Sequence, residues 1–326
     1  MLSRFRTKHL ASAVGCLSAA VTASAHVYIP KAERAGAYPK AEGAGWVGQV
    51  FLNLPESAVT NTITAESYIA GRQPDFTFRT PWIDFPAGPV GVTPDKNFVL
   101  VGDFLNDYLY DVSDPAKLDE PMSHLVLRFT GFVKVVLEDE VRIRDIFGMP
   151  IWIEFGSLGY DGFNIRVGNV ICYERPNSNF SNPWFNFGPA LQAQGLFPIM
   201  VTYFNRYDPG NLVGAPNGGI ELYSWHGGGL ALPAGENMIH AVRGPGTLVP
   251  PRIIYQAGDV LPVLQGDFDA DSDVDFRDIQ WFQECYYPPN GFIILPDGCE
   301  TFDFAPDSDV DRDDFAEFLS LITGPQ

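Results

Sequence analysis

The chain has 326 residues, of which 46% are hydrophobic and 19% are charged, so it can bury a sizeable core and is neither disordered nor collagen-like. Its 40 acidic and 21 basic residues give a formal net charge of −19, which argues against a nucleic-acid partner because phosphate contacts require basic side chains. The acid is concentrated at one end, since the segment from Gly266 onward carries 16 acidic and two basic residues. We therefore expect a near-neutral body followed by an acidic tail.

The first 25 residues have the pattern of an export signal. Three basic residues between positions 4 and 8 precede the apolar run Leu10–Val21, and the small residues Ala23-Ser24-Ala25 follow it. The run is shorter than the roughly 20 residues that a membrane-spanning helix needs, and no later run reaches that length. The sequence therefore predicts export without a membrane span, to the periplasm, the cell surface or the medium.

The body, residues 26–260, consists of short runs rich in Val, Ile, Phe and Tyr that glycines and prolines interrupt. This punctuation is typical of an all-β domain, and the lengths of the runs suit antiparallel strands packed as a sandwich. Helical periodicity is nearly absent from the body. The expected strands are Trp46–Leu54, Asn97–Phe104, Leu125–Leu137, Met149–Phe155, Phe163–Tyr173, Phe197–Phe204 and Gly219–Trp225.

Several local motifs follow one another through the body. They are Gly45-Trp46-Val47-Gly48-Gln49, Pro74–Phe78, Ile83–Pro86, Phe104-Leu105-Asn106, Leu127–Phe132, Tyr160–Gly168, Gly195–Phe204 and Gly218–Tyr223. In this order they resemble the protective-antigen-type (PA-fourteen) domain of toxins, glycosidases and adhesins. The resemblance implies a β-sandwich and, in sugar-binding members, a glycan ligand.

Two features of the body are candidates for glycan binding. In sugar-binding members of the resembled family, two adjacent aspartates before a glycine hold a calcium ion; here Tyr160 replaces the first, while Asp161 and Gly162 match. A hairpin turn at Asp161-Gly162 is the alternative. The loop expected at Asn177–Phe187 carries Trp184 among other aromatic and polar residues, which suits either stacking on a sugar or packing onto its own sandwich.

The sequence predicts no catalytic residue. It lacks the zinc-binding His-Glu-x-x-His motif, the Gly-x-Ser-x-Gly elbow, the Walker loop and the Cys-x-x-Cys pair. An acidic cluster at Glu138, Asp139, Glu140 and Asp145 could serve acid–base chemistry or form a solvated insertion, and we favour the insertion.

The tail, residues 261–326, contains an internal repeat, because residues 267–278 align with residues 303–314. Acidic residues at loop positions 1, 3, 5, 9 and 12, with a main-chain carbonyl at position 7, are the ligands of an EF-hand calcium loop. Solvated acidic tails do not require this fixed spacing, so we favour calcium as the cofactor. The predicted ligands are Asp267, Asp269, Asp271, Asp273 (through its carbonyl), Asp275 and Asp278 in the first loop, and Asp303, Asp307, Asp309, Asp311 and Asp314 in the second.

Two departures from the EF-hand pattern weaken the predicted sites. Position 6 requires a left-handed backbone that favours glycine, and it is occupied by Ser272 in the first loop and Ser308 in the second. Ala305 stands at position 3 of the second loop, where a ligand is expected. We therefore expect the second loop to bind calcium more weakly than the first.

Each loop precedes a predicted helix, Phe276–Tyr286 or Asp313–Ile322, and no helix enters either loop. The apolar positions Ile279, Phe282, Phe315, Phe318, Leu319 and Ile322 have helical spacing and are expected to form one shared face. Two loop–helix units resemble a type I dockerin, and this resemblance implies a cohesin-like protein partner.

Cysteine usage agrees with export. Cys285 and Cys299 flank the segment between the first helix and the second loop, and are expected to form a disulfide in an oxidising compartment. Cys172 lies in an apolar run and is expected to be a buried, inert thiol.

The fold class expected is mostly β, an antiparallel sandwich followed by a small α-helical calcium-binding domain of two loop–helix repeats. We expect a secreted, non-catalytic binding or adhesion module, with a glycan as the candidate ligand and a calcium-dependent tail for attachment to a protein partner. Two alternatives stay open: a component of extracellular polysaccharide degradation, and a structural surface or matrix protein.

Overall fold

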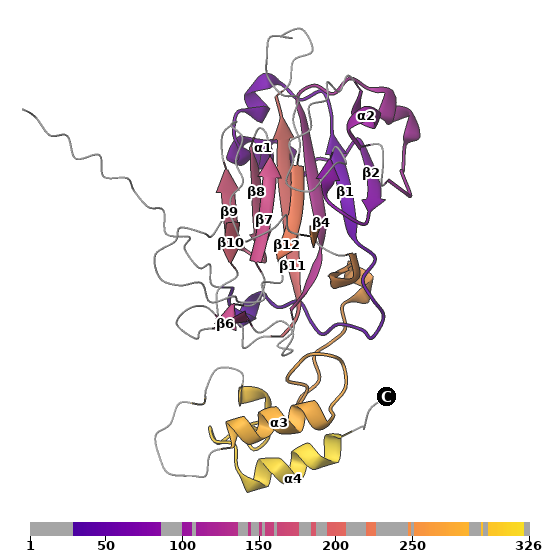
Figure 1. The fold of residues 1–326 in the computed structure, drawn as a ribbon. Coiled ribbons are helices and arrows are strands. Elements are labelled where there is room, and N and C mark those ends of the chain that lie inside the picture. Colours follow the sequence, from indigo (N-terminus) through magenta and orange to yellow (C-terminus); the bar gives the residue numbers. More distant parts are fainter. Residues whose placement is uncertain are drawn as a thin grey trace, which may run out of the picture.

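The computed structural model describes residues 29–85, 100–105, 109–135, 143–144, 150–151, 154–159, 162–175, 184–186, 194–206, 220–225, 247–248, 251–286, 295 and 299–322. The predicted export signal, residues 1–25, and Asp161 lie outside these ranges. A two-layered β-sandwich forms the body, and a pair of short helices forms the tail beneath it (Figure 1). Within the described residues, no helix is long and apolar enough to cross a membrane.

The larger sheet has seven antiparallel strands in the order β2-β1-β4-β11-β8-β9, with β14 also paired to β4. Side chains alternate between its two faces: in β4, for example, Leu127 and Phe129 are fully buried whereas Arg128 is only partly buried. The strands are β1 (Trp46–Phe51), β2 (Phe76–Thr80), β4 (Leu125–Val135), β8 (Phe163–Val167), β9 (Val170–Arg175), β11 (Gly195–Asn205) and β14 (Ile254–Tyr255).

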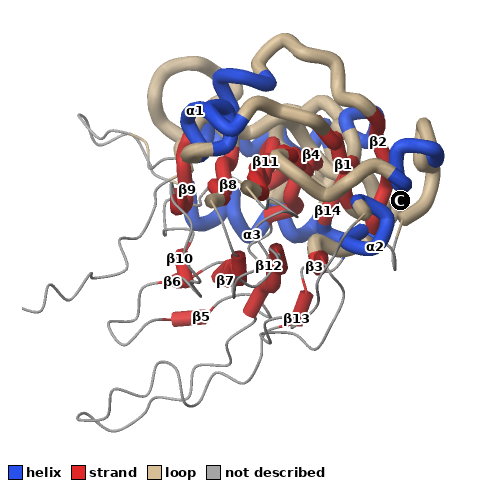
Figure 2. The backbone as a smooth tube through the Cα atoms, turned by 90° about the horizontal axis from the view of Figure 1, so that it is seen from above, coloured by secondary structure: helices blue, strands red, loops and turns tan. Residues whose placement is uncertain are grey.

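The smaller sheet lies across the inner face of the larger one as a second layer (Figure 2). It has the order β10-β7-β12-β13, and β3 also pairs with β12. A separate two-stranded pair is formed by β5 and β6. The strands are β3 (Asp84–Phe85), β5 (Ile143–Arg144), β6 (Pro150–Ile151), β7 (Glu154–Gly159), β10 (Trp184–Asn186), β12 (Ile220–Trp225) and β13 (Thr247–Leu248).

Aromatic side chains join the two layers. The ring of Phe85, from the smaller sheet, stacks on Phe129 of the larger sheet with centroids 5.6 Å apart and meets Phe78 edge-on at 6.0 Å. The ring of Phe78 lies directly over Gly48 of the neighbouring strand, in the space that a Cβ atom would occupy. The predicted antiparallel sandwich is therefore confirmed. Gly48 leaves room for the ring of Phe78 because it has no side chain.

A helix that the sequence analysis missed covers the outer face of the larger sheet. It is α1 (Thr62–Ile69), which packs with Phe51, Val126 and Phe204 in a second core. Polar contacts also hold it there, since Glu66 accepts hydrogen bonds from Arg166 Nη2 at 3.0 Å and Thr202 Oγ1 at 3.1 Å. The local signal for this helix is its capping box, in which Asn61 and Thr64 satisfy each other's backbone amides.

Two predicted strands are wrong. The run expected as Asn97–Phe104 ends in a short helix, α2 (Val101–Leu105), because Leu100 N–H is capped by Asp103 and the turn packs on the 3₁₀ helix Pro115–Asp119. The run expected as Phe163–Tyr173 is instead the β8–β9 hairpin, which turns at Gly168 with a φ of +56°.

Two other expectations change in the smaller sheet. The run Met149–Phe155 is divided between β6 and β7, which belong to different sheets. The strands β7 and β8 also do not form the hairpin expected around Asp161-Gly162, because they lie in different sheets and do not pair; Asp161 itself lies outside the described residues. Gly162 therefore belongs to a connection between the two layers.

The tail contains α3 (Phe276–Cys285), a 3₁₀ turn (Cys299–Thr301) and α4 (Arg312–Leu321), so both predicted helices are present to within one residue at each end. The disulfide between Cys285 and Cys299 is formed, with a Cα–Cα distance of 5.4 Å. The core of the tail is largely aromatic. Phe302 stacks parallel to Phe268 at 5.7 Å and meets Phe282 and Phe318 edge-on.

The shared apolar face of the two helices is only partly buried. Phe282 and Phe318 lie in the core, and Ile279 and Ile322 pack against it. Phe315 and Leu319, which were expected on the same face, are 36% and 48% exposed. The reason is that each helix contacts the rest of the tail through one narrow stripe, so side chains at the margin of the stripe remain accessible to solvent.

Candidate metal centre in the tail loops

The first loop brings three aspartates together. One carboxylate oxygen from each of Asp267, Asp269 and Asp271 lies within 4.8 Å of the other two. Asp267 closes the loop, because its two oxygens accept hydrogen bonds from Asp271 N–H and Ser272 N–H, both at 3.1 Å. The chain therefore folds back on its own first ligand position and leaves the three carboxylates facing one point.

These carboxylates are poorly compensated within the described protein. Asp267 is 1% exposed and Asp269 is 7% exposed, and Oδ1 of Asp269 is buried without a hydrogen-bond partner. Burial, followed by the charge of neighbouring carboxylates, raises the pKa of Asp267 and of Asp269 to about 7. A bound divalent cation would offset both causes, because it supplies positive charge to the buried carboxylates and coordinates the unpartnered oxygen. The residues therefore fit a hard, oxygen-coordinated metal ion.

Position 6 of each loop has the predicted left-handed backbone. The φ angle is +76° at Ser272 and +71° at Ser308, where the sequence analysis expected a glycine-like turn. Each serine N–H donates to the aspartate at position 1 of its own loop, at 3.1 Å for Ser272 and 3.2 Å for Ser308. The strained turn therefore directs a main-chain amide onto the carboxylate that closes the loop.

The aspartates at positions 9 and 12 of the first loop also hold the backbone in place, a role that the sequence analysis did not identify. Asp275 is the N-cap of α3, and its side chain accepts Arg277 N–H at 2.7 Å. Asp278, which is fully buried, accepts Phe268 N–H at 2.7 Å and Asp275 N–H at 2.8 Å. These residues tie the start of the helix to the start of the loop, and a capping-box pattern in the sequence signals that role.

The second loop repeats this hydrogen-bond pattern. Asp303 accepts Asp307 N–H and Ser308 N–H at 3.3 and 3.2 Å, and Asp314 accepts Phe304 N–H and Asp311 N–H at 2.7 and 2.8 Å. The oxygens that converge within 4.8 Å here are those of Asp307, Asp309 and Asp314.

The second loop differs from the first in its exposure and in its converging set. Asp307 is exposed, and Asp303 is not among the carboxylates that converge. Ala305, at position 3, has no carboxylate and uses its N–H to donate to Asp314 at 2.9 Å. The second loop therefore offers a more exposed and less complete set of oxygens.

The candidate glycan residues of the body are not brought together in the described part of the chain. Asp161 lies outside it, and Gly162 is buried and accepts Phe204 N–H through its carbonyl at 3.0 Å. Trp184 was expected in a loop but begins β10, an edge strand of the smaller sheet, where its backbone pairs with Gly156. For residues 184–186 the loop expectation is wrong, because they extend the sheet beyond β7; the rest of the expected loop lies outside the described residues.

Cys172 lies in β9 and is 5% exposed, as the sequence predicted. Burial raises the pKa of its thiol to about 12, so the reactive thiolate is scarce at neutral pH.

Comparison with known proteins gives no family assignment. No protein-family model matches the chain. No curated protein matches it either.

Among solved structures, a PA14 sugar-binding domain from an RTX adhesin is similar at 17% identity over 56% of this chain and 88% of that chain, with a TM-score of 0.35. The PA14 domain of the antifreeze protein MpAFP is similar at 15% identity over 57% and 82%, with a TM-score of 0.34. The A domain of epithelial adhesin 6 from Candida glabrata, in complex with Galβ1-3GlcNAc, is similar at 11% identity over 58% and 83%, with a TM-score of 0.34. These TM-scores are low, so the likeness carries no conclusion about what this chain does.

Proposed function

We propose that this protein is an exported, non-catalytic binding module whose tail folds around calcium. One observation carries the proposal: three aspartates of the first loop, two of them buried and Asp271 partly buried, converge on one point, and Oδ1 of Asp269 has no hydrogen-bond partner there. Buried carboxylates are normally hydrogen-bonded or paired with a cation, so this arrangement calls for a positive ion. Calcium suits an all-oxygen site and is available at millimolar concentration outside cells.

The first loop is proposed as the stronger site. Its side-chain ligands would be Asp267, Asp269 and Asp271, with the main-chain carbonyl of Asp273, while Asp275 and Asp278 hold the loop against α3 and complete the oxygen-rich surroundings. The second loop is proposed as weaker, because Ala305 contributes no carboxylate and Asp307 is exposed. Its candidate ligands are Asp303, Asp307, Asp309, Asp311 and Asp314.

Calcium binding is tested by isothermal titration of the chain without its predicted signal, residues 26–326, after treatment with a chelating resin. Asp269→Asn keeps the shape of the side chain but removes the charge of the unpartnered carboxylate, so we expect the tighter binding event to be lost. Asp313→Asn is the matched control, because Asp313 is exposed and its side chain lies outside both converging sets. Equal calcium binding by the two variants would rule out the first loop as the site.

The ligand class proposed for the sandwich is a glycan, and the partner class proposed for the tail is a cohesin-like protein. Support comes from the motifs in the body that resemble the protective-antigen-type domain and from the two loop–helix units that resemble a dockerin. The proposed glycan-contacting residues are Asp161, Gly162 and Trp184.

A glycan-array screen of the same chain, with calcium and with chelator, tests the ligand class. We expect hits that Trp184→Ala weakens and that Ile63→Ala, at an exposed position of α1, leaves unchanged. An array without hits would refute the glycan as ligand but would leave calcium binding by the tail standing.

A further inference from the structure

The segment from residue 29 to residue 40, which we name the strap, runs along the lower edge of the sandwich and faces the tail (Figure 1). At its start, Ile29 is 1% exposed and belongs to the main core. Further along, Gly36 forms a β-bridge with Leu196 of β11, and Ala37 forms one with Leu261 at the beginning of the tail. The strap is therefore attached to both parts of the molecule.

The far end of the strap binds the first calcium loop directly. Tyr38 N–H donates to the carbonyl of Ala270 at 3.0 Å, and the hydroxyl of Ser272 donates to the carbonyl of Tyr38 at 2.9 Å. Next to these bonds, Lys40 Nζ lies 3.1 Å from Oδ2 of Asp273. The side chain of Asp273 is therefore directed at the strap. The same residue is the one proposed to offer its main-chain carbonyl to calcium.

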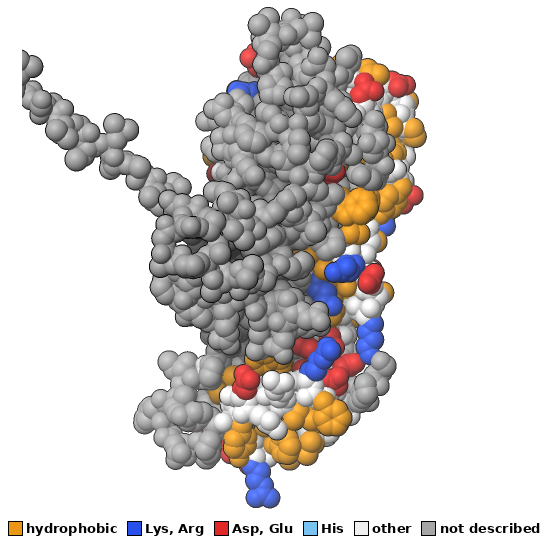
Figure 3. Space-filling view, viewed as in Figure 1, with side chains coloured by type: hydrophobic (Ala, Val, Ile, Leu, Met, Phe, Trp, Pro, Cys, Tyr) orange, Lys and Arg blue, Asp and Glu red, His pale blue; other side chains and the backbone are white. Residues whose placement is uncertain are grey.

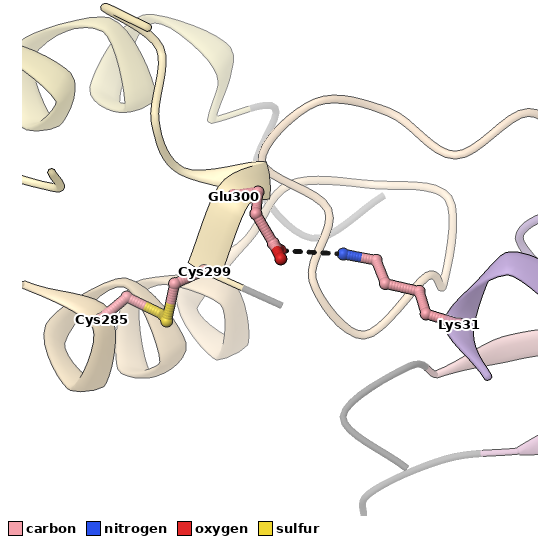
Figure 4. Close-up of a disulfide and its surroundings, with 4 residues drawn as sticks. All are labelled: Lys31, Cys285, Cys299 and Glu300. Atoms are coloured by element: carbon pink, nitrogen blue, oxygen red, sulfur yellow. Dashed lines mark hydrogen bonds and ion pairs between the residues drawn. A yellow bond between two sulfur atoms is a disulfide. The ribbon is translucent and has the colours of Figure 1, made fainter. Parts of the chain in front are cut away.

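A second contact lies beside the disulfide. Lys31 Nζ is 3.2 Å from Oε2 of Glu300, the residue that follows Cys299 (Figure 4). Basic and acidic side chains gather where the sandwich meets the tail (Figure 3). The strap is therefore a basic segment that matches the acidic tail in charge as well as in hydrogen bonding.

The packing at Gly195 shows how closely strap, sandwich and loop approach one another. Gly195 begins β11 with a φ of +126°, and a Cβ atom there would lie 2.6 Å from Gly36 O, 2.9 Å from Arg34 Cδ and 3.3 Å from Ala270 Cβ. Arg34 also anchors the strap to the sandwich, because its Nη1 donates to the carbonyl of Gln194 at 3.2 Å. Three segments distant in sequence thus meet around one glycine.

We propose that the strap is the built-in partner of the first loop, so that calcium entry into this loop and docking of the tail onto the sandwich are one coupled event. The inference rests on the calcium binding proposed above. The strap holds Ala270 and Ser272, which lie between the ligands Asp269 and Asp273, in the conformation that the closed loop needs. By thermodynamic linkage, calcium in the loop must stabilise the strap by the same factor as the strap tightens calcium. The face of the first loop that meets the strap is consequently unavailable to an external partner, and docking of another protein uses the remainder of the tail.

A matched pair of substitutions isolates this coupling. Ser272→Ala removes the hydroxyl that donates to the strap, but it retains a Cβ atom and therefore the same left-handed strain. Ser308→Ala makes the identical change at the same position of the second loop, where φ is nearly the same and the serine is exposed. Neither change alters the charge around the ions. Both variants are made in residues 26–326 with the strap and the tail intact.

Hydrogen exchange at residues 36–40 and calcium titration are then measured for the native chain and both variants. In the native chain, calcium is expected to slow exchange at the strap. Ser272→Ala is expected to reduce that protection and to weaken the tighter calcium event about fivefold, the usual contribution of one hydrogen bond. Ser308→Ala is expected to leave both unchanged.

Two results overturn the inference in distinguishable ways. If the native chain binds calcium but exchange at residues 36–40 does not respond to it, or if the two serine variants behave alike, the coupling is wrong and the calcium site stands. If the native chain binds no calcium in the titration, the proposed function and the coupling fall together.

Discussion

Replacing both Cys285 and Cys299 by alanine is expected to lower the free energy of unfolding of the tail by about 3 kcal/mol. The two residues are 14 positions apart in sequence, and the disulfide closes the segment that joins α3 to the second loop. Closing a loop of about 15 residues removes roughly 10 cal/mol/K of entropy from the unfolded chain, which gives the 3 kcal/mol at 25 °C.

This amount is large for the tail. A unit of its size has a stability of roughly 3–10 kcal/mol, and here that stability depends on a small aromatic core and on loops whose carboxylates repel one another. We therefore expect the double alanine variant to keep a folded tail in millimolar calcium and to lose it in chelator, because bound calcium adds stability by mass action.

Urea unfolding, followed by the fluorescence of Trp281, measures the effect, because this side chain stacks on Phe268 at 4.5 Å within the tail. The five other tryptophans of the chain also emit, so the tail transition is assigned by its response to calcium. Cys172→Ala is the matched control, since it removes a buried thiol from the sandwich without breaking a cross-link. Equal midpoints for the tail transition in the native chain and the double variant would refute the reasoning.

Three further predictions concern single positions. Gly48→Ala is expected to destabilise the sandwich by about 1–3 kcal/mol in urea unfolding, because the ring of Phe78 occupies the place of the new methyl group; an unchanged midpoint would contradict the packing described. Burial raises the pKa of the Cys172 thiol to about 12, well above its ordinary value. At pH 8, therefore, only about one molecule in ten thousand carries the reactive thiolate. A thiol reagent should therefore label it only after denaturation, and labelling of the folded chain would contradict its burial. Ser308→Gly should raise tail stability by about 1 kcal/mol in thermal melts, because glycine adopts the φ of +71° without strain; a lower melting temperature would argue against that turn.

The sequence alone determined the features that depend on neighbouring residues. The alternation of apolar and polar residues in Leu125–Leu137 and Phe197–Phe204 identified the two long strands, β4 and β11. In the structure these strands pair with each other over 11 residue pairs. The 36-residue offset of the acidic repeat located both loops, and the need for a left-handed residue at position 6 is met at Ser272 and Ser308. These are local rules, because backbone conformation and ligand spacing are read from a few consecutive residues.

Other features depended on where distant segments meet. The run Phe163–Tyr173 looks like one strand, but it becomes a hairpin because β8 pairs with β11 and the chain turns back at Gly168. The helix α1 is short, and its place is set by contacts of Glu66 with strand residues 100 and 136 positions away in sequence. Trp184 also lies in a strand because of a distant segment, since the backbone of β10 pairs with β7.

The candidate metal centre shows the same division. Sequence spacing named its aspartates, but only the tertiary structure distinguished the three of the first loop that converge on one point from Asp275 and Asp278, whose side chains hold the backbone of the loop and of α3. Nothing in the strap's sequence marks it as the neighbour of the first loop, because that contact joins residues more than 230 positions apart. Local sequence sets which conformations a segment favours, whereas burial of apolar surface over the whole chain decides which segments come together.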